Sequence, residues 1–479
     1  MRISGTKYKQ KSAVCRPITK VPTQSLSEPG FYFFPILPAQ QSISKVAKRQ
    51  NVRIDLNLNI RGLKKSATLA INERSRQLQE QGREVFKLGF GQSPFPVPAP
   101  VVESLRQHAH EKDYLPVKGL PALRQSIADF YLRQQGIKRT AEDVLIGPGS
   151  KELLFILQLA YYGDLVIPTP SWVSYSPQAI ILGRRVNWVK THQENDWRLT
   201  PEELESICEL DPERPRIVIL NYPANPTGAT YTADRLKKIA EVARKYRVIL
   251  LSDEIYGELH HSGQHVSVAR YYPEGTIISS GLSKWCGAGG WRLGMFVFPK
   301  ELRWLLDAMA IVASETFTST SAPIQYAAVE AFQPHEAIDQ YLRDAQRILR
   351  NIGRYFHGQL QDMRVFAPKP AGGFYLFPNF AFYENNLRNK GISNSGQLCE
   401  RLLEDTGVAL LPSYDFGRPS DELTARLSYV DFDGEKALNL ARTTYQSKSI
   451  DEAFIQACCG DMLEAFDRIR DWLQSKTGK

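Results

Sequence analysis

The chain has 479 residues, of which 43% are hydrophobic and 23% are charged. This composition is typical of a folded globular protein and excludes disorder for most of the chain. The longest apolar run, residues 31–39, contains two prolines and is far shorter than the about 20 residues of a membrane-spanning helix, so we predict no membrane association. Six cysteines without a CxxC pair predict no disulfide framework and favour a reducing, cytoplasmic location.

The net charge of +9 is unevenly distributed. Residues 1–53 contain ten Lys or Arg and one acidic residue, so the rest of the chain is balanced. A neutral body predicts no nucleic-acid partner. We interpret residues 1–60, which are basic and rich in Ser, Gln and Pro, as a flexible extension. The alternative is an organellar transit peptide, because such leaders are basic and poor in acids.

From residue 64 onward, short apolar strands alternate with amphipathic helices. Helices are predicted to begin near residue 66, over residues 150–161, from Thr232 as an N-cap, and over about 300–358. Strands are predicted at residues 144–146, 165–167, 217–220, 248–251, 276–279 and 295–298. Apolar strands separated by amphipathic helices predict a buried, mostly parallel sheet and an α/β fold.

Polar and glycine-rich segments follow these strands directly. In open α/β sheets, ligands bind outside the carboxyl ends of the strands, so these segments should meet at one site. The chemically informative residues in them are Gly149, Ser150, Lys151, Trp172, Asn225, Asp253, Tyr256, Lys284 and Arg292.

This set of side chains suits a phosphorylated aromatic aldehyde. A lysine forms a Schiff base with the aldehyde, and a carboxylate keeps the ring nitrogen protonated so that the ring withdraws electrons. An aromatic residue stacks on the ring, while an amide and a phenol bind its 3-oxygen. A helix N-terminus beside cationic side chains binds the phosphate.

Four motifs carry a resemblance to a known family. They are Asn225-Pro-Thr-Gly, Ser252-Asp-Glu-Ile-Tyr, Ser283-Lys and Gly290-Trp-Arg-Leu-Gly. In this order and spacing they resemble the signature blocks of class I/II aminotransferases, pyridoxal-phosphate (PLP) enzymes of fold type I, in the aspartate/aromatic group. The resemblance covers about residues 64–475 and implies a three-layer PLP-binding domain with a smaller α+β domain.

The resemblance implies domain boundaries and residue roles. Residues 61–105 and 346–479 would form the small domain, and residues 106–345 the large one. Lys284 would be the Schiff-base lysine and proton carrier, with Asp253 on the pyridine nitrogen. The implied catalytic residues are Lys284, Asp253 and Tyr256, the implied cofactor-binding residues are Gly149, Ser150, Lys151, Trp172, Asn225, Asp253, Tyr256, Ser283, Lys284, Arg292 and Tyr114, and the implied substrate-binding residues are Gly91, Trp172, Asn225 and Arg426.

Two of these assignments concern assembly and substrate. In the family a tyrosine at the position of Tyr114 reaches the phosphate of the neighbouring subunit, which implies a homodimer. Arg426 corresponds to the arginine that clamps the α-carboxylate. The sequence departs from some relatives at Gly281, where they carry a serine, so we expect one phosphate contact fewer. No metal site is expected, and we interpret the stretch with His260, His261 and His265 as a solvated loop.

The predicted function is transfer of an amino group from an amino acid to a 2-oxo acid. A lyase acting on sulfur amino acids, or an aminocyclopropane-carboxylate synthase, is the alternative on the same fold. A PLP-binding DNA regulator is the remote alternative, because five prolines in residues 1–60 leave too little chain for a winged-helix module. Lys118 and Arg61 are the candidate ligands for a second substrate carboxylate.

Overall fold

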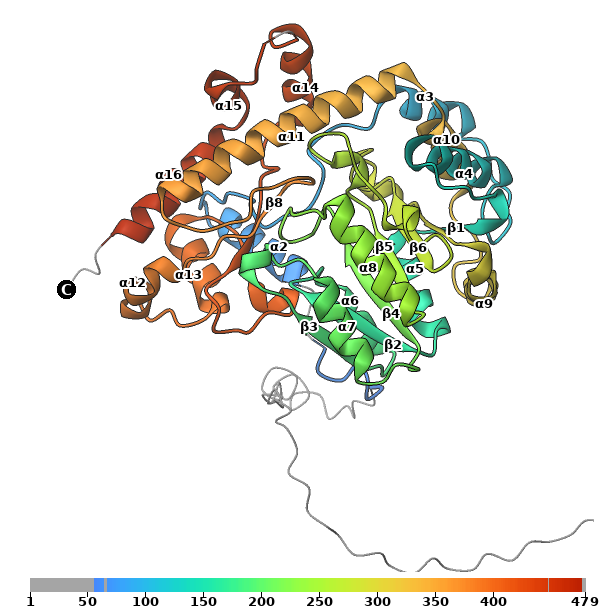
Figure 1. Cartoon of the computed structure of the whole chain (residues 1–479). Coiled ribbons are helices and arrows are strands. Elements are labelled where there is room, and N and C mark those ends of the chain that lie inside the picture. The colour runs from blue at the N-terminus through green and yellow to red at the C-terminus, as the bar shows by residue number, and fades with distance from the viewer. Residues whose placement is uncertain (1–55, 64–66, 447, 476–479) are drawn as a thin grey trace, which may run out of the picture. The chain divides into compact units, whose positions relative to one another are not determined.

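The computed structural model describes residues 56–63, 67–446 and 448–475, all within the unit Leu56–Lys479 (Figure 1). The basic extension predicted at residues 1–60 therefore lies outside the described residues, apart from its last five positions. A seven-stranded sheet, in the order β1-β7-β6-β5-β4-β2-β3, forms the centre of this unit. Its strands are β1 (Val144–Gly147), β2 (Asp164–Thr169), β3 (Val186–Lys190), β4 (Arg216–Asn221), β5 (Ile249–Asp253), β6 (Thr276–Gly281) and β7 (Gly294–Val297).

Most neighbouring strands of this sheet run parallel. The pairs β2–β3, β2–β4, β4–β5 and β5–β6 are parallel, whereas β7 runs antiparallel to both β1 and β6. The predicted α/β fold is confirmed. The edge strand β3 has no counterpart in the prediction, because three of its five residues are exposed and its sequence lacks an uninterrupted apolar run.

Each central strand supplies side chains to two apolar cores. In β4, Ile217 and Ile219 join one core, while Val218 and Leu220 join the other. This alternation follows from the two-residue period of a strand, and it explains why strands covered on both faces are apolar throughout. The covering helices are α5 (Ser150–Ala160), α6 (Tyr175–Ile181) and α9 (Arg303–Ser314) on one face, and α7 (Pro201–Glu209) and α8 (Ala233–Lys245) on the other.

The start of α8 follows the predicted capping pattern. The Thr232 hydroxyl accepts a hydrogen bond from the Arg235 amide at 3.3 Å, which satisfies one free N–H of the first turn. The helix then buries four apolar side chains at spacings of three and four, Leu236, Ile239, Ala240 and Ala243. Beyond the sheet edge at β1, a group of helices comprises α3 (Ala99–His108), α4 (Pro121–Gln135) and α10 (Ala322–Phe332).

A long helix, α11 (Glu336–Asp362), connects this part to a second, smaller sheet (Figure 1). The small sheet has the order β8-β10-β9, with β8 (Tyr375–Leu376), β9 (Leu411–Pro412) and β10 (Ala425–Ser428). The remaining helices of this part are α12 (Glu384–Asn389), α13 (Ser395–Thr406), α14 (Gly434–Thr443), α15 (Glu452–Cys458) and α16 (Gly460–Gln474).

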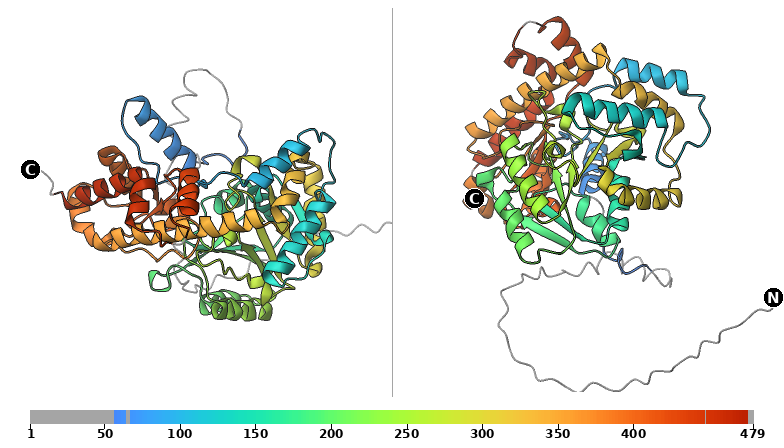
Figure 2. Two further views of the ribbon diagram at one scale, coloured as in Figure 1. Left: turned by 90° about the horizontal axis from the view of Figure 1, so that it is seen from above. Right: turned by 45° about the vertical axis from the view of Figure 1, so that its right-hand side comes forward.

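The first helix of the described chain, α2 (Ala67–Glu80), packs against this C-terminal part (Figure 2). Leu78 shares a small core with Leu403 of α13, and Arg74 forms an ion pair with Glu404. The apolar segment after α2 makes only an isolated bridge, between Phe86 and Val408. Within the described ranges, no helix combines the length and the apolar character needed to cross a bilayer.

Candidate active site

The carboxyl ends of β4, β5 and β6 meet in register. Asn221 of β4 pairs with Asp253 of β5, and Asp253 pairs with Ser279 of β6. The Asn221 side chain ties the following turn to this edge, because its Oδ1 accepts from the Asn225 amide at 2.8 Å and its Nδ2 donates to the Asp253 carbonyl at 3.0 Å. The strands thus bring together residues that are 26 or more positions apart in the chain.

Asp253 is a buried carboxylate at the centre of this edge, with 3% of its surface exposed. Its Oδ2 accepts a hydrogen bond from the Tyr175 hydroxyl at 2.5 Å, and its Oδ1 accepts one from Ser279 Oγ at 3.4 Å. Burial raises the pKa of this carboxyl to about 6, although both hydrogen bonds act in the opposite direction. Among the described residues, no Lys, Arg or His forms an ion pair with Asp253. The negative charge of this carboxylate is therefore available to a positively charged group of a ligand.

Lys284 lies after β6, and its Nζ donates to the Gly91 carbonyl at 2.5 Å. Burial, together with the positive charges of Arg426, Arg292 and Lys151, lowers the pKa of this amine to about 8. The amine lies 5.7 Å from the centre of the Tyr256 ring. Lys284 therefore loses its proton more readily than an ordinary lysine does, and the uncharged amine is the form that attacks an aldehyde or accepts a proton.

Three glycines let the main chain approach closely at the N-terminus of α5, and we call them the glycine cradle: Gly149, Gly281 and Gly294. A Cβ on Gly294 would lie 2.1 Å from the Ser150 amide nitrogen. One on Gly149, which has φ +93°, would lie 2.3 Å from Arg292 Nη2. The cradle therefore places free N–H groups of a helix N-terminus beside a guanidinium, as an anion site requires.

The departure at Gly281 has a structural explanation. A Cβ there would lie 2.7 Å from the Leu293 carbonyl oxygen and 3.0 Å from Gly294 Cα, both on the neighbouring strand segment. The spacing between β6 and β7 at this point leaves no room for a serine side chain.

Arg426 forms the opposite wall of the site, with 2% of its surface exposed. Its Nη2 donates to the Gly89 carbonyl at 2.6 Å, and its Nη1 donates to Asn225 Oδ1 at 3.1 Å. Its Nε is buried without a hydrogen-bond partner. Burial lowers the pKa of this guanidinium, and an unpaired buried N–H favours an anionic ligand at this wall.

The family model for aminotransferases of class I and II matches residues 83–440. The aspartate aminotransferase of Geobacillus stearothermophilus is 36% identical over 381 residues, which cover 77% of this chain and 93% of that protein. The asparagine–oxo-acid transaminase of Streptococcus mutans is 30% identical over 384 residues, which cover 78% of this chain and 94% of that protein.

Solved structures agree with the sequence comparisons. The aspartate aminotransferase of Thermus thermophilus with maleate has a TM-score of 0.72 at 31% identity, over 81% of this chain and all of that chain. The aspartate aminotransferase of Rhizobium meliloti has a TM-score of 0.74 at 28% identity, over 88% of this chain and 99% of the other. The chain belongs to the class I and II aminotransferases. It is a fold type I, PLP-dependent aminotransferase that acts on amino acids and 2-oxo acids.

The donor set of this aminotransferase fits PLP. The glycine cradle and Arg292 match a phosphate, the unpaired Asp253 matches a protonated ring nitrogen, and the lowered pKa of Lys284 matches an amine that binds an aldehyde. Trp172 borders the same space, where its ring meets the Tyr175 ring edge-on at 5.3 Å and lies 5.1 Å from Lys151 Nζ.

The structure brings most of the predicted site residues of the aminotransferase together. The exception is Tyr114, which is 89% exposed on the surface of the described subunit, so it faces away from this subunit's own interior. Of the two candidate ligands for a second carboxylate, Lys118 already pairs with Asp307 at 2.7 Å, and Arg61 is exposed in the segment before α2.

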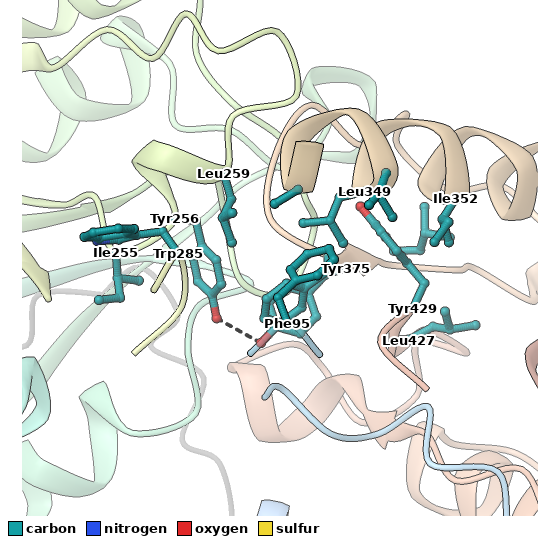
Figure 3. Packing of buried hydrophobic residues seen from close by; sticks show 14 of the residues in the cluster. Phe95, Ile255, Tyr256, Leu259, Trp285, Leu349, Ile352, Tyr375, Leu427 and Tyr429 are labelled. Carbon is teal, nitrogen blue, oxygen red and sulfur yellow. Dashed lines mark hydrogen bonds between the residues drawn. The ribbon is translucent and has the colours of Figure 1, made fainter. Parts of the chain in front are cut away.

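Two tyrosines of the site are absent from the predicted set. Tyr175 supports Asp253, and its position at the start of a helix, three residues after Trp172, is the signal in the sequence that points to it. Tyr375 is almost fully buried, and its hydroxyl lies 2.9 Å from the Tyr256 hydroxyl (Figure 3). The Gly372-Gly373 pair before two aromatic residues is the only local sign of it.

The interpretation of residues 260–265 as a solvated loop is wrong for two of its histidines. His261 is 5% exposed and lies between the Pro370 and Gly373 carbonyls, and burial lowers its pKa to about 4. His265 Nε2 lies 2.9 Å from Glu254 Oε2, with both side chains nearly inaccessible. Polar sequence neighbours concealed this burial, which tertiary packing alone produces. Within the part of the chain that is described, no three His, Cys, Asp or Glu residues are grouped to hold a metal ion.

Proposed function

We propose that this aminotransferase uses a dicarboxylic amino acid, aspartate in the first instance, as its amino donor, with Lys284 as the residue that carries the proton. The observation that carries the proposal is the Lys284 amine, whose lowered pKa results from burial and from three surrounding cations. Three cations around one amine, Arg426, Arg292 and Lys151, make this a site for anionic groups, such as a phosphate and substrate carboxylates.

The proposed roles follow from the contacts. Bound PLP supplies the aldehyde that links to Lys284 and a ring that withdraws electrons from the reacting carbon. Asp253 holds a proton on the ring nitrogen. Asn225 and Tyr256 orient the ring through its 3-oxygen, and the Ser150, Ser283 and Arg292 side chains at the glycine cradle bind the phosphate.

Arg426 is proposed to bind the α-carboxylate of the substrate. A carboxylate accepts two parallel N–H bonds from a guanidinium, and this geometry holds the amino acid in one orientation. Lys284 Nζ then removes the proton from Cα and returns it during the second half of the reaction. The Gly91 carbonyl, which accepts a hydrogen bond from Lys284 at 2.5 Å, fixes the amine before substrate arrives.

Lys151 is the proposed ligand for the second carboxylate. Its position at the start of α5 favours a phosphate contact, but its amine lies 5.1 Å from the Trp172 ring, and no carboxylate contributes to its pKa shift among the described residues. Burial and the charge of Arg292 lower its pKa, so a nearby carboxylate would stabilise its charged form. The relatives named aspartate aminotransferase support this substrate class.

The decisive experiment compares amino donors with wild-type and Lys151→Ala protein. We expect oxaloacetate from L-aspartate without release of ammonia, and conversion of the PLP absorbance to that of its amine form. Lys151→Ala should raise KM for aspartate about tenfold or more and leave KM for alanine unchanged, because only aspartate has the second carboxylate. An equal loss for both donors, with weaker PLP binding, would assign Lys151 to the phosphate instead. Ammonia release would indicate a lyase.

The active unit is proposed to be a homodimer, located in the cytoplasm. The 89% exposure of Tyr114 supports this, because the family places that tyrosine on the phosphate of a second subunit. Sedimentation at assay concentration measures the mass of the active form directly.

A further inference from the structure

We propose that Tyr375 is a positioning residue of the PLP site: its hydroxyl receives a hydrogen bond from Asn225 and donates one to Tyr256, which leaves the Tyr256 proton free for the cofactor. This inference rests on the proposed roles of Tyr256 and Asn225. It concerns a residue of the small sheet, more than 100 positions away from either partner in the sequence.

The Asn225 amide fixes the direction of this chain of hydrogen bonds. Arg426 Nη1 donates to Asn225 Oδ1 at 3.1 Å, so the Asn225 Nδ2 group must point the other way. It points to the Tyr375 hydroxyl, at a long but allowed 3.5 Å. Either hydroxyl can donate across the 2.9 Å between Tyr375 and Tyr256, and because the Tyr256 proton is assigned to the cofactor, the proton between them is assigned to Tyr375. Successive hydrogen bonds polarise one another, so Tyr256 becomes a stronger donor than it would be alone.

The surroundings of the Tyr375 hydroxyl hold it in place. The residue is 1% exposed, and a Cβ on Gly91 would lie 2.3 Å from its oxygen, so the hydroxyl rests against the main chain of Gly91. Figure 3 shows Tyr256 and Tyr375 approaching from opposite sides with their hydroxyls facing each other. The Gly91 carbonyl also accepts the Lys284 hydrogen bond, so the contact reaches the reactive amine through one peptide unit.

The ring of Tyr375 has a separate contact. The Arg426 guanidinium lies 4.8 Å from the ring centre, a distance at which a cation is attracted to an aromatic face. The hydroxyl therefore serves Tyr256, while the ring supports the arginine proposed to bind the substrate carboxylate. Two substitutions separate these contributions, because phenylalanine keeps the ring and leucine removes it.

The test is a spectrophotometric pH titration of the PLP bound to Lys284, without substrate. Tyr375→Phe should raise the pKa of that lysine–PLP link by about 0.5, since the loss of one supporting hydrogen bond weakens the Tyr256 donor that favours its unprotonated form. KM for the amino acid should change less than about twofold. Tyr375→Leu should show the same titration shift and, in addition, raise KM about tenfold through Arg426.

Tyr429→Phe is the matched control. Tyr429 is also fully buried, and its hydroxyl lies 3.3 Å from the Gly373 carbonyl, away from Tyr256. The pH titration of the Tyr429→Phe protein should equal that of the wild type, even if the melting temperature of the variant falls. A wild-type titration curve in Tyr375→Phe would overturn the inference, as would an equal shift in Tyr429→Phe. Failure of the wild-type protein to bind PLP at Lys284 would instead overturn the proposed function, so the two failures are distinguishable.

Discussion

The two ends of the active site are built in different ways. At the glycine cradle, main-chain atoms approach so closely that a Cβ on Gly294 would lie 2.1 Å from the Ser150 nitrogen. At the opposite end, Arg426, Asn225 and Tyr375 make the site from side chains that hydrogen-bond or stack on one another. The first end depends on the absence of side chains, and the second depends on their identity. Substitutions at the glycine cradle should therefore disturb the packing of the main chain, whereas substitutions at the end with Arg426 should change hydrogen bonds and charge.

Lys284→Ala should have the largest effect, because Lys284 lies between the two ends and serves both. The proposed nucleophile and the proposed base would be lost together, so turnover should fall by at least about 10³-fold. Borohydride reduction of the wild-type protein followed by peptide mapping should find PLP on Lys284. A label on Lys151 or Lys300 would contradict the assignment.

Gly294→Ala should be the most damaging change at the cradle. The added Cβ collides with the main chain around Ser150, and overpacking of this kind costs about 1–3 kcal/mol of stability. We expect weaker PLP binding in an equilibrium titration and a lower melting temperature. The matched control is Gly290→Ala, where nothing lies within 4 Å of the new Cβ, so its stability should change by less than about 0.5 kcal/mol. Equal PLP binding and equal melting temperatures of the two variants would contradict the role of the glycine cradle in binding the phosphate.

Asp253→Asn should separate stability from function at the strand ends. The pKa of Asp253 is raised to about 6, so the folded protein without PLP binds its proton more tightly than the unfolded chain does. The wild type therefore loses stability as the pH rises from about 4 to 6. Without PLP, Asp253→Asn should be more stable than the wild type by about 1–3 kcal/mol at pH 7.5, and this difference should vanish below about pH 4.

Calorimetry of the two proteins without PLP at both pH values provides the measurement. With PLP added, the wild type should be the more active of the two proteins, although it is the less stable one without PLP. The reason is that an asparagine would not hold the ring nitrogen protonated. A constant stability difference between pH 4 and 7.5 would show that Asp253 is not titrating in this range.

Tyr114→Phe should have the smallest effect on the subunit itself, below about 0.5 kcal/mol, because the side chain is 89% exposed. Mixing Tyr114→Phe subunits with Lys284→Ala subunits tests its role. In a shared-site dimer, the hybrid has one site with both changes and one with neither, so activity should exceed that of the Lys284→Ala protein. A fully active monomer would remove the basis of this prediction.

The cradle and the strand ends could be predicted from the sequence because each of their parts is local. A buried strand followed by a polar or glycine-rich turn places its chemistry at the sheet edge, and this holds for Asp253 and Lys284. The role of Gly281 also becomes clear once β6 and β7 are paired.

The arginine end could be predicted only in part. The resemblance identified Arg426, but no local pattern placed the Tyr375 hydroxyl beside Tyr256, because the two residues are 119 positions apart. The burial of His261 and His265 has the same cause, since other segments of the chain cover them although their neighbours in sequence are polar. Long-range packing decides both cases.

The helix α11 has a mechanical consequence for the site. Its 27 residues make a rod about 40 Å long, with Tyr341 near one end against Phe95 and Phe356 toward the other against Phe466. About two thirds of the way along the helix, Gly353 lies against the hydroxyl of Tyr429, which is three residues beyond Arg426 in the chain. Because the helix is about 40 Å long, a tilt of about 5° about one of its ends would move its other end by about 3.5 Å. A tilt of this helix would therefore shift Gly353 against the Tyr429 hydroxyl, in the chain segment that follows Arg426.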